Sequence, residues 1–493
     1  MVPSHIAVVG GGLTGLSSAW HLARRFPQTA ISVIEKESRF GGWIRSERIE
    51  VDDGNGHRES MVLEAGPRTL RPRSKAILEL VHLLNLEESL ITIPLTSPAA
   101  KSRFLHLPGR TGLAVLPSSF TSLFTSPFLR LMLPAIAREP FKAPNRPDGI
   151  KDEAFDSLLS RRFGPEFART LGSALVHGVY AADSRQLSVR SAFPTIWTAE
   201  ENGKGSIVRG FMQRRGTSEE PAYDLGDMEA TMKAVSVYSF KDGMYALVDA
   251  LLKSLKTRPN VRLLPNTAVT SLTSNEGGDT MQIVAGSEKL KPSHVVAALP
   301  LPQLAVIPPS SPLPHLTANP ASSVTVMNIV FPPSSQSIHP PGFGYLIPRP
   351  QPPFEYDGTQ PGILGTVFDS CSVGAQDIPL QSSTSASERF TKVTVMLGGP
   401  YKLTPEHTSV PTVLRHLSSH LSTTLPDPVL VRVHHHRDCI PTPTLGHLER
   451  MEELRRVLAS GPWNGRFEVI GAGVTGVSLG ECVEAGRKVG SNW

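Results

Sequence analysis

Three glycines near the start of the chain have the spacing of a phosphate-binding turn. Gly10, Gly12 and Gly15 form the pattern G-x-G-x-x-G between an apolar run, His5 to Val9, and an apolar-faced segment that continues to Arg25. In a strand–turn–helix unit, such glycines permit a tight turn, let a pyrophosphate approach the backbone and allow close packing of helix on sheet. Free N–H groups at the helix start then face the phosphate charge. The pattern predicts a dinucleotide-binding turn.

A carboxylate stands where the ribose of such a dinucleotide would be recognised. A second apolar run, Ala30 to Ile34, ends at Glu35. In dinucleotide-binding folds an acidic residue about 20 positions after the last glycine binds the ribose hydroxyls. A chance glycine turn would need neither the second strand nor its acidic end, so we interpret Glu35 as the ribose-binding residue.

The residues after Glu35 favour a flavin over a nicotinamide cofactor. Flavoproteins of the amine-oxidase and desaturase kind carry R-x-G-G-[RW] here, which matches Arg39-Phe-Gly-Gly-Trp43. Nicotinamide enzymes have no general need for a second glycine pair at this point. Further along, Glu64-Ala-Gly-Pro-Arg68 is similar to the segment by which these folds line the flavin ring. Glu64 could instead cap the next expected helix, residues 73–84.

A second glycine-rich turn lies near the C-terminus. Gly471-Ala-Gly-Val-Thr-Gly476 follows an apolar run, Phe467 to Ile470, and precedes a helical segment that reaches about Gly486. The chain stops at Trp493, too soon for the second strand and acidic residue of a complete dinucleotide site. We therefore expect this strand to return to the first sheet. Its helix would direct N–H groups at the flavin, because a helix N-terminus favours the negative charge of a reduced flavin.

Composition argues against other classes of partner. The net charge is +5, and no run of basic residues suggests nucleic-acid binding. Three separated cysteines, Cys371, Cys439 and Cys482, predict reduced thiols or packing residues and not a disulfide frame or a zinc site. The run His434 to His436 also predicts no metal site, because neighbouring side chains of a strand point to opposite faces.

Patterns along the chain predict an α/β architecture with three parts. Residues 1–95, 236–305 and 430–493 are expected to form a discontinuous, Rossmann-like FAD-binding domain of the amine-oxidase or p-hydroxybenzoate-hydroxylase kind. The segment 96–235 has a helical pattern. The segment 306–429, where Pro- and Ser-rich stretches separate strand patterns, is expected to form a mixed-sheet substrate domain.

One apolar stretch, residues 113–137, permits two interpretations. Pro117, Pro127 and Pro134 divide it into pieces too short to cross a bilayer. It could pack in a core, or it could dip into one leaflet of a membrane and make 96–235 a membrane-associated insert. Because the first strand begins at His5, we also expect no cleavable presequence.

With these segments placed, the chain resembles the protoporphyrinogen oxidases, flavoenzymes of late haem synthesis, over essentially its whole length. The most specific matching strings are Gly342-Phe-Gly344, Leu364-Gly-Thr-Val-Phe-Asp-Ser370 and Val395-Met-Leu-Gly-Gly399. The chain departs from the family in the string Ile440 to His447. It also carries Glu481 at or beside a position where many relatives have aspartate.

The resemblance implies non-covalent FAD and a porphyrinogen pocket, with no catalytic side-chain base and no metal. Flavin contacts are implied for Gly10, Gly11, Gly12, Leu13, Thr14, Gly15, Glu35, Lys36, Gly42, Trp43, Gly66, Pro67, Arg68, Thr69, Val269, Ala472, Val477, Ser478 and Leu479. Arg103 would pair with a substrate propionate. The apolar walls would be Phe343, Gly344, Leu346, Val367 and Met396.

The resemblance also implies an activity and a place in the cell. Protoporphyrinogen IX would lose six electrons in three flavin cycles, giving protoporphyrin IX and three H2O2 from O2 in the penultimate step of haem biosynthesis. It suggests a homodimer at the surface of the mitochondrial inner membrane that passes product to ferrochelatase. The alternatives are an amine oxidase or carotenoid desaturase of the same fold, or a flavin-fold escort protein without activity.

Overall fold

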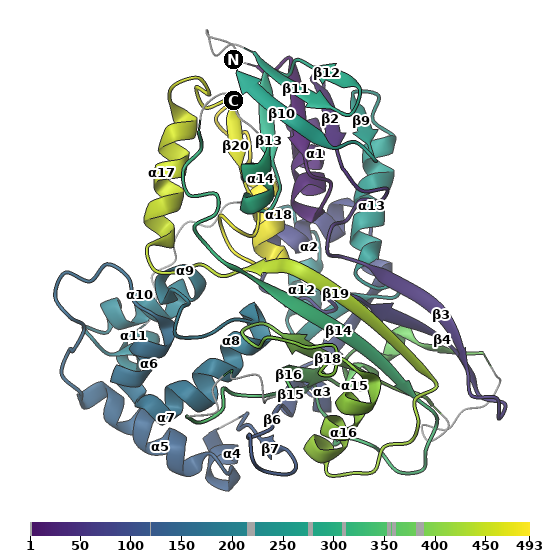
Figure 1. Cartoon of the computed structure of the whole chain (residues 1–493), viewed down its shortest axis with the longest axis vertical. Helices are drawn as coiled ribbons and strands as arrows, with labels where there is room; N and C mark the ends of the chain where they lie inside the picture. The colour runs from purple at the N-terminus through teal and green to yellow at the C-terminus, as the bar shows by residue number, and fades with distance from the viewer. Residues whose placement is uncertain are drawn as a thin grey trace.

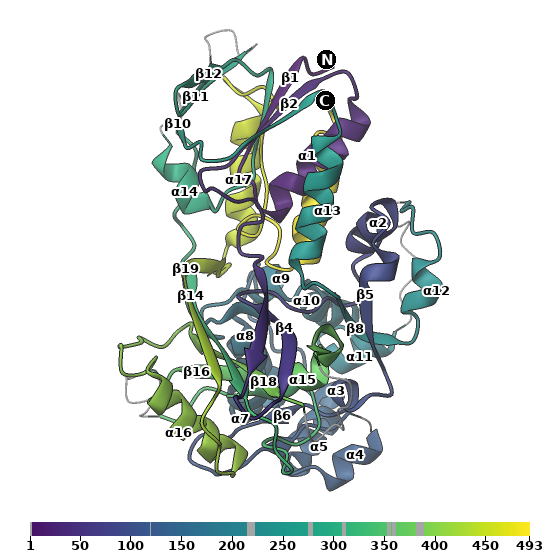
Figure 2. The ribbon, with the colours of Figure 1, turned by 90° about the vertical axis from the view of Figure 1, so that its right-hand side faces the viewer.

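Two sheets of different kinds organise the molecule. The structure is a computed structural model that describes residues 2–118, 120–213, 222–274, 280–307, 312–352, 356, 361–380 and 389–493. The upper part holds a parallel sheet and both termini, the lower part holds a larger mixed sheet, and a cluster of helices lies beside that larger sheet (Figures 1 and 2). The predicted α/β class with a mixed second sheet is confirmed.

The upper sheet contains both strands of the predicted dinucleotide unit. Its five parallel strands lie in the order β20 (Phe467–Val469), β13 (His294–Ala297), β1 (His5–Val9), β2 (Ala30–Ile34) and β9 (Val261–Leu264). The central strand β1 is apolar from Ile6 to Val9 because both faces of the sheet are covered. Ile6 and Val8 pack into one core, and Ala7 and Val9 into another. The expected return of the C-terminal strand is confirmed by the pairing of β20 with β13.

Helices and a small sheet cover the two faces. One face packs against α1 (Leu13–Arg25), α2 (Lys75–Leu83), α13 (Tyr245–Lys256) and α18 (Leu479–Lys488). The other packs against α17 (His447–Ala459) and the sheet of β10 (Val269–Ser274), β11 (Met281–Ala285) and β12 (Glu288–Leu290). This layering leaves the starts of α1 and α18 at the end of the sheet that faces the lower part (Figures 1 and 2).

The lower sheet draws strands from distant parts of the chain. Its order is β19 (Leu430–Pro441), β14 (Ala321–Phe331), β18 (Thr391–Gly398), β16 (Ile363–Val367), β15 (Gly344–Leu346), β6 (Phe104–Leu105) and β7 (Ala114–Val115). Strands β6 and β7 come from the segment predicted to be helical, and β19 comes from the segment assigned to the FAD-binding domain. The lower sheet therefore draws strands from all three predicted parts of the chain.

Two antiparallel strand pairs lie between the upper and lower parts. Strands β3 (Ser46–Asp52) and β4 (Arg58–Glu64) form a long hairpin that runs down beside the lower sheet (Figure 2). Strands β5 (Leu90–Pro94) and β8 (Val235–Phe240) pair below α2. Because Ser46 pairs with Glu64, the hairpin returns the residues after Glu64 to the side of Arg45.

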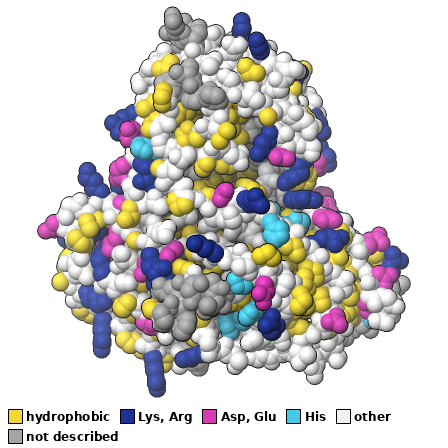
Figure 3. All heavy atoms as spheres, viewed as in Figure 1, with side chains coloured by type: hydrophobic (Ala, Val, Ile, Leu, Met, Phe, Trp, Pro, Cys, Tyr) yellow, Lys and Arg dark blue, Asp and Glu magenta, His cyan; other side chains and the backbone are white. Residues whose placement is uncertain are grey.

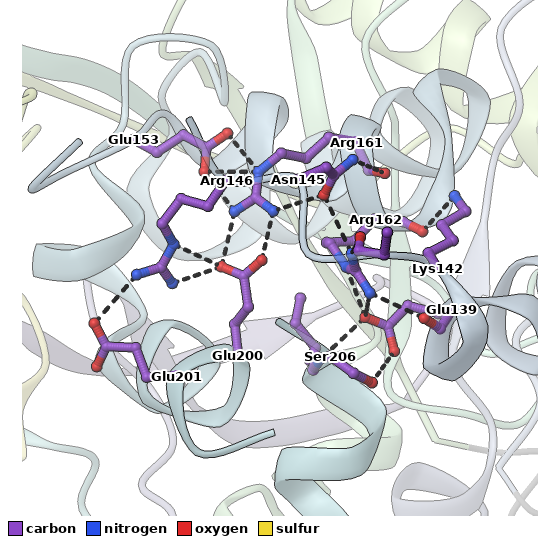
Figure 4. Close-up of polar contacts among 12 residues, drawn as sticks. Glu139, Lys142, Asn145, Arg146, Glu153, Arg161, Arg162, Glu200, Glu201 and Ser206 are labelled. Atoms are coloured by element: carbon purple, nitrogen blue, oxygen red, sulfur yellow. Dashed lines mark hydrogen bonds and ion pairs between the residues drawn. The ribbon is translucent and has the colours of Figure 1, made fainter. Parts of the chain in front are cut away.

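A buried network of charges holds the helical cluster together (Figure 4). The cluster includes α5 (Leu129–Arg138), α6 (Phe155–Phe163), α8 (Ser173–Tyr180), α10 (Pro194–Asn202) and α11 (Ile207–Met212). Glu139 and Arg162 are both fully buried and lie 2.7 Å apart, while Arg146 and Arg161 converge on Glu200. Removing one member would leave an uncompensated buried charge, so the network fixes how these helices pack. No helix in the described ranges is long and apolar enough to cross a bilayer.

Candidate active site

The first glycine turn forms an open backbone cradle. Gly10 has a φ of +105°, and a Cβ on Gly15 would lie 1.9 Å from the Gly10 carbonyl oxygen, so the helix sits directly on the turn. At the start of α1 no described side chain caps the first N–H groups. A Cβ on Gly12 would find no described atom closer than the Cα of Gly42, at 3.9 Å. An approachable, uncapped helix start fits a pyrophosphate.

Glu35 is held at the end of β2 by backbone amides. Its side chain is 9% exposed, and its carboxylate oxygens accept hydrogen bonds from the N–H groups of Gly11 at 2.7 Å and Glu37 at 2.9 Å. Each oxygen can still accept another bond. The Thr267 amide donates to the Glu35 carbonyl at 2.8 Å, which brings the strand that begins at Val269 to the same corner. The structure therefore brings the predicted adenosine-side residues together, with Lys36 beside them.

The expected flavin-ring segments join this cradle directly. Gly12 pairs with Gly41, and the Gly41 amide donates to the Gly11 carbonyl at 2.8 Å. A Cβ on Gly66 would lie 2.4 Å from the carbonyl oxygen of Trp43, so these two segments are in close backbone contact. Gly42, Trp43 and Gly66 to Thr69 thus continue the surface that starts at the glycine turn.

Arg68 is bound by the lower sheet. Its guanidinium is buried and lies 3.1 Å from the Asp369 carboxylate, which also accepts a hydrogen bond from the Thr394 hydroxyl. Asn328 donates to both the Glu64 carbonyl and the Thr394 hydroxyl. These bonds fasten the segment after Glu64 to the sheet. Asp369 engages the Arg68 side chain, and the Arg68 carbonyl accepts a hydrogen bond from the Ser239 hydroxyl at 2.8 Å. Among the described residues the Arg68 amide has no backbone acceptor, so it is the group left for a flavin contact.

Glu64 caps a helix other than the expected one. Its carboxylate accepts hydrogen bonds from the Met244 amide at 2.7 Å and the Ser46 hydroxyl at 2.8 Å, and Ser46 in turn accepts from the Tyr245 amide. The capped helix is α13, far along the sequence, whereas the expected helix begins after Ser74. Burial raises the pKa of the Glu64 carboxyl to about 7.

The second glycine turn differs from expectation in one respect. Ser478 and Glu481 form a capping box, in which the Ser478 amide donates to the Glu481 carboxylate at 3.1 Å and the Glu481 amide donates to the Ser478 hydroxyl at 3.2 Å. The Ser478 amide is therefore not free to face a flavin. Within the described residues, the amides of Val477 and Leu479 have no acceptor. The spacing S-x-x-E before an apolar run would have predicted this cap.

The predicted apolar wall lies on one face of the lower sheet. Gly344 pairs with Val367 across β15 and β16, and Leu346 and Met396 both pair with Gly365. Because alternate residues of a strand share a face, these side chains point the same way. A Cβ on Gly178 of α8 would touch Leu346, so the helical cluster borders this wall.

Phe343 and Arg103 stand at the edge of that wall. Phe343 is half-buried and packs against the cluster of Ile91, Ile93 and Val237 on the neighbouring strand pair. The Arg103 guanidinium carbon lies 6.0 Å from the centre of the Phe343 ring. Without the family resemblance Arg103 would be classed as an ordinary surface arginine. The structure places it beside a predicted substrate contact.

A hollow opens beside the second glycine turn. It is lined by Tyr180, Pro441, Pro443, His447, Leu448, Ala472, Gly473, Thr475 and Val477, among others. Figure 3 shows hydrophobic side chains gathered in the recess between the upper and lower parts. His447 is buried, shares a 2.8 Å hydrogen bond with the Asn319 amide, and has its pKa lowered by that burial. Sequence reasoning missed His447 as a residue of this recess.

The histidine run lies on β19 and bonds to the protein. His435 shares a hydrogen bond with the Thr325 hydroxyl, and His436 donates to the Ala65 carbonyl at 2.6 Å, next to Gly66. The His436 ring also meets the Trp43 ring edge to face, with centres 5.3 Å apart. In the part of the chain that the structure describes, no three His, Cys, Asp or Glu side chains form a metal-binding group.

The whole chain is similar to a known group of flavoproteins. The model of the family described as flavin-containing amine oxidoreductase matches residues 13–489. Protoporphyrinogen oxidases of Macaca fascicularis and Homo sapiens are each 31% identical to it, over 98% of this chain and 97% of the relative. A crystal structure described as a protoporphyrinogen oxidase of Exiguobacterium sp. 255-15 superposes with a TM-score of 0.72 at 20% identity, over 98% of this chain and 97% of that chain.

Proposed function

Since the chain belongs to the flavin-containing amine oxidoreductases, and among them to the protoporphyrinogen oxidases, we propose that it oxidises protoporphyrinogen IX to protoporphyrin IX. It is a flavin-dependent oxidoreductase. We propose O2 as its acceptor, with three H2O2 formed per substrate in the penultimate step of haem biosynthesis. The observation that carries the proposal is the apolar wall of Leu346, Val367 and Met396, which borders the predicted flavin segment.

The residues of the first turn fit FAD. The cradle is open at Gly12, the start of α1 is uncapped, and the Glu35 carboxylate retains acceptor capacity for ribose hydroxyls. Gly42, Trp43, Gly66 and the loop from Ala472 to Leu479 would hold the flavin end. When bound, FAD supplies the two-electron chemistry.

The chain's own contribution would be binding and orientation. The wall residues Gly344, Leu346, Val367 and Met396 carry no titratable group, so none of them can act as a general base. They would hold the macrocycle against the cofactor, where correct orientation alone can supply much of the acceleration. Arg103 would pair with a propionate and select substrates that carry a carboxylate.

We also propose that the helical cluster rests on a membrane surface. Every side chain of α5 is at least partly exposed, although the helix is mostly apolar. Phe141 is 89% and Met212 79% exposed on the same cluster. Helices with one apolar face and few partners lie in the interfacial plane of a bilayer. The resemblance further supports a homodimer at the mitochondrial inner membrane that passes product to ferrochelatase.

Porphyrin fluorescence after adding protoporphyrinogen IX in air tests the proposed reaction. The purified holoenzyme should raise fluorescence well above the rate of autoxidation and release peroxide. Arg103→Ala should slow the reaction while retaining the flavin absorbance. A yellow protein that leaves the autoxidation rate unchanged would contradict the proposal and direct attention to amines or polyenes as substrates.

A further inference from the structure

Three arginines near the proposed substrate edge have no anionic partner among the described residues. Within the described ranges, the side chains of Arg71, Arg73 and Arg103 make no hydrogen bond or ion pair. Other exposed arginines are of both kinds, and among the paired ones Arg48 pairs with Asp242 and Arg262 with Glu288. Partial burial lowers the pKa of Arg71, and the charges of Arg103 and then Arg73 lower it further. The positive charges of Arg103 and Arg73 therefore both act on Arg71.

Backbone pairing brings Arg71 towards Arg103. Leu70 exchanges two hydrogen bonds with Tyr238 on β8, at 2.8 and 2.9 Å. Val237, the neighbour of Tyr238, belongs to the cluster on which Phe343 packs. The Arg103 guanidinium lies 6.0 Å from the Phe343 ring, so the same strand pair neighbours both Phe343 and the segment that begins at Arg71.

The other end of this segment touches the proposed flavin helix. A Cβ on Gly480, in the first turn of α18, would lie 2.4 Å from the Ser74 hydroxyl oxygen. Residues 71–74 therefore connect the start of α18 to the edge of the apolar wall. A ligand that reached from the wall towards this helix would lie beside residues 71–74.

Carboxylates are the anions that suit this arrangement. A guanidinium binds a carboxylate through two parallel hydrogen bonds, and such pairs are stronger than neutral ones. The porphyrinogen of the proposed reaction carries two propionates on neighbouring pyrrole rings, whereas Arg103 accounts for one.

We propose that Arg71 binds the second propionate, so that Arg71 and Arg103 form a clamp specific for dicarboxylate macrocycles. This inference rests on the proposed function. Arg73 adds positive charge behind Arg71 and strengthens the attraction. An ester at either propionate removes the negative charge, so the clamp distinguishes a diacid from its diester.

Binding of mesoporphyrin IX and of its dimethyl ester to the holoenzyme, followed by porphyrin fluorescence, tests the clamp without turnover. Arg71→Gln should weaken binding of the diacid about tenfold, or about 1.4 kcal/mol, and leave diester binding unchanged. Arg71→Lys should fall between wild type and Arg71→Gln, because an ammonium keeps the charge but loses the bidentate geometry. Arg456→Gln, at an exposed arginine on α17, is the matched control and should bind both porphyrins as wild type does.

The kinetic counterpart separates this inference from the proposed function. Arg71→Gln should raise KM for protoporphyrinogen IX about tenfold and change kcat less than twofold. Unchanged diacid binding, or an equal loss for diacid and diester, would overturn the clamp. The clamp would also be overturned if Arg71→Gln lost affinity for anionic lipid vesicles but kept its affinity for mesoporphyrin IX. If wild type oxidises the substrate but Arg71→Gln behaves like it, the function stands and the clamp fails. If mesoporphyrin binding depends on Arg71 but no substrate is oxidised, the clamp stands and the function fails.

Discussion

The two glycine-rich turns share a sequence pattern, but the helix after the first starts without a side-chain cap and the helix after the second starts with one. In the first, Gly15 lies against the Gly10 carbonyl and α1 starts without a cap. In the second, Gly476 lies beneath the Glu481 carboxylate, and α18 starts with the box of Ser478 and Glu481. An uncapped helix start leaves its backbone N–H groups free to bind phosphates. At a capped start, side chains of the protein already accept hydrogen bonds from some of these N–H groups. The pattern alone therefore does not identify a phosphate site; the cap distinguishes the two.

Adding a methyl group to Gly15 should break the first turn, whereas a methyl group on a glycine outside both turns should leave the flavin bound. In Gly15→Ala the new Cβ would lie 1.9 Å from a backbone oxygen, so the turn must move. We expect loss of nearly all FAD and a stability loss of roughly 1–3 kcal/mol or more. In the control Gly374→Ala, which lies outside both turns, the new Cβ would meet no described atom within 4 Å, and FAD should remain. Flavin absorbance per mole of protein measures the FAD content of both variants. Equal FAD retention in the two would contradict the proposed role of the first turn.

A third helix start, that of α13, has a capping carboxyl group whose titration should make stability depend on pH. The pKa of its cap Glu64 is raised from 4.5 to about 7 by burial, so between these values the folded state binds more protons than the unfolded state. This contribution is present at low pH and is lost as pH rises through 7. Relative to Glu64→Gln, wild type should lose roughly 2–3 kcal/mol of unfolding free energy between pH 4.5 and 8. Chemical denaturation of wild type and Glu64→Gln at several pH values measures this free energy. If the unfolding free energies of the two proteins changed with pH in parallel, the raised pKa of Glu64 would be contradicted.

Removing Glu35 should weaken the first turn without unfolding it. Glu35→Ala deletes two bonds to the amides of Gly11 and Glu37 and the proposed ribose contact. We expect FAD affinity to fall about 10- to 100-fold, or about 1.4–2.8 kcal/mol. Quenching of flavin fluorescence on reconstitution of the apoprotein gives the Kd. An unaltered Kd would show that Glu35 only supports the turn.

Breaking the cap of the second turn should have the smallest effect. Glu481→Ala removes the carboxylate that accepts from the Ser478 amide. The expected cost is about 1 kcal/mol of unfolding free energy, with FAD content unchanged, as thermal unfolding and absorbance would show. Loss of flavin from this variant would mean that the cap itself carries the cofactor.

Features set by neighbouring residues could be predicted from the sequence. The first turn, β1, β2 and Glu35 are contiguous, and the apolar run before the second turn predicted the strand β20. Contacts between residues that are far apart in the sequence could not be predicted. Alternation on β19 shows a strand but not its pairing with β14, and nothing near Arg68 indicates Asp369. The capping of α13 by Glu64 joins residues that are adjacent only after folding.

The number of FAD molecules released per chain tests most directly whether the two turns serve one cofactor. The protein can be denatured, and the free flavin measured against protein concentration for wild type and Gly15→Ala. We predict one FAD per wild-type chain and almost none per Gly15→Ala chain. Two per wild-type chain, or a full complement in Gly15→Ala, would contradict the division of roles between the turns.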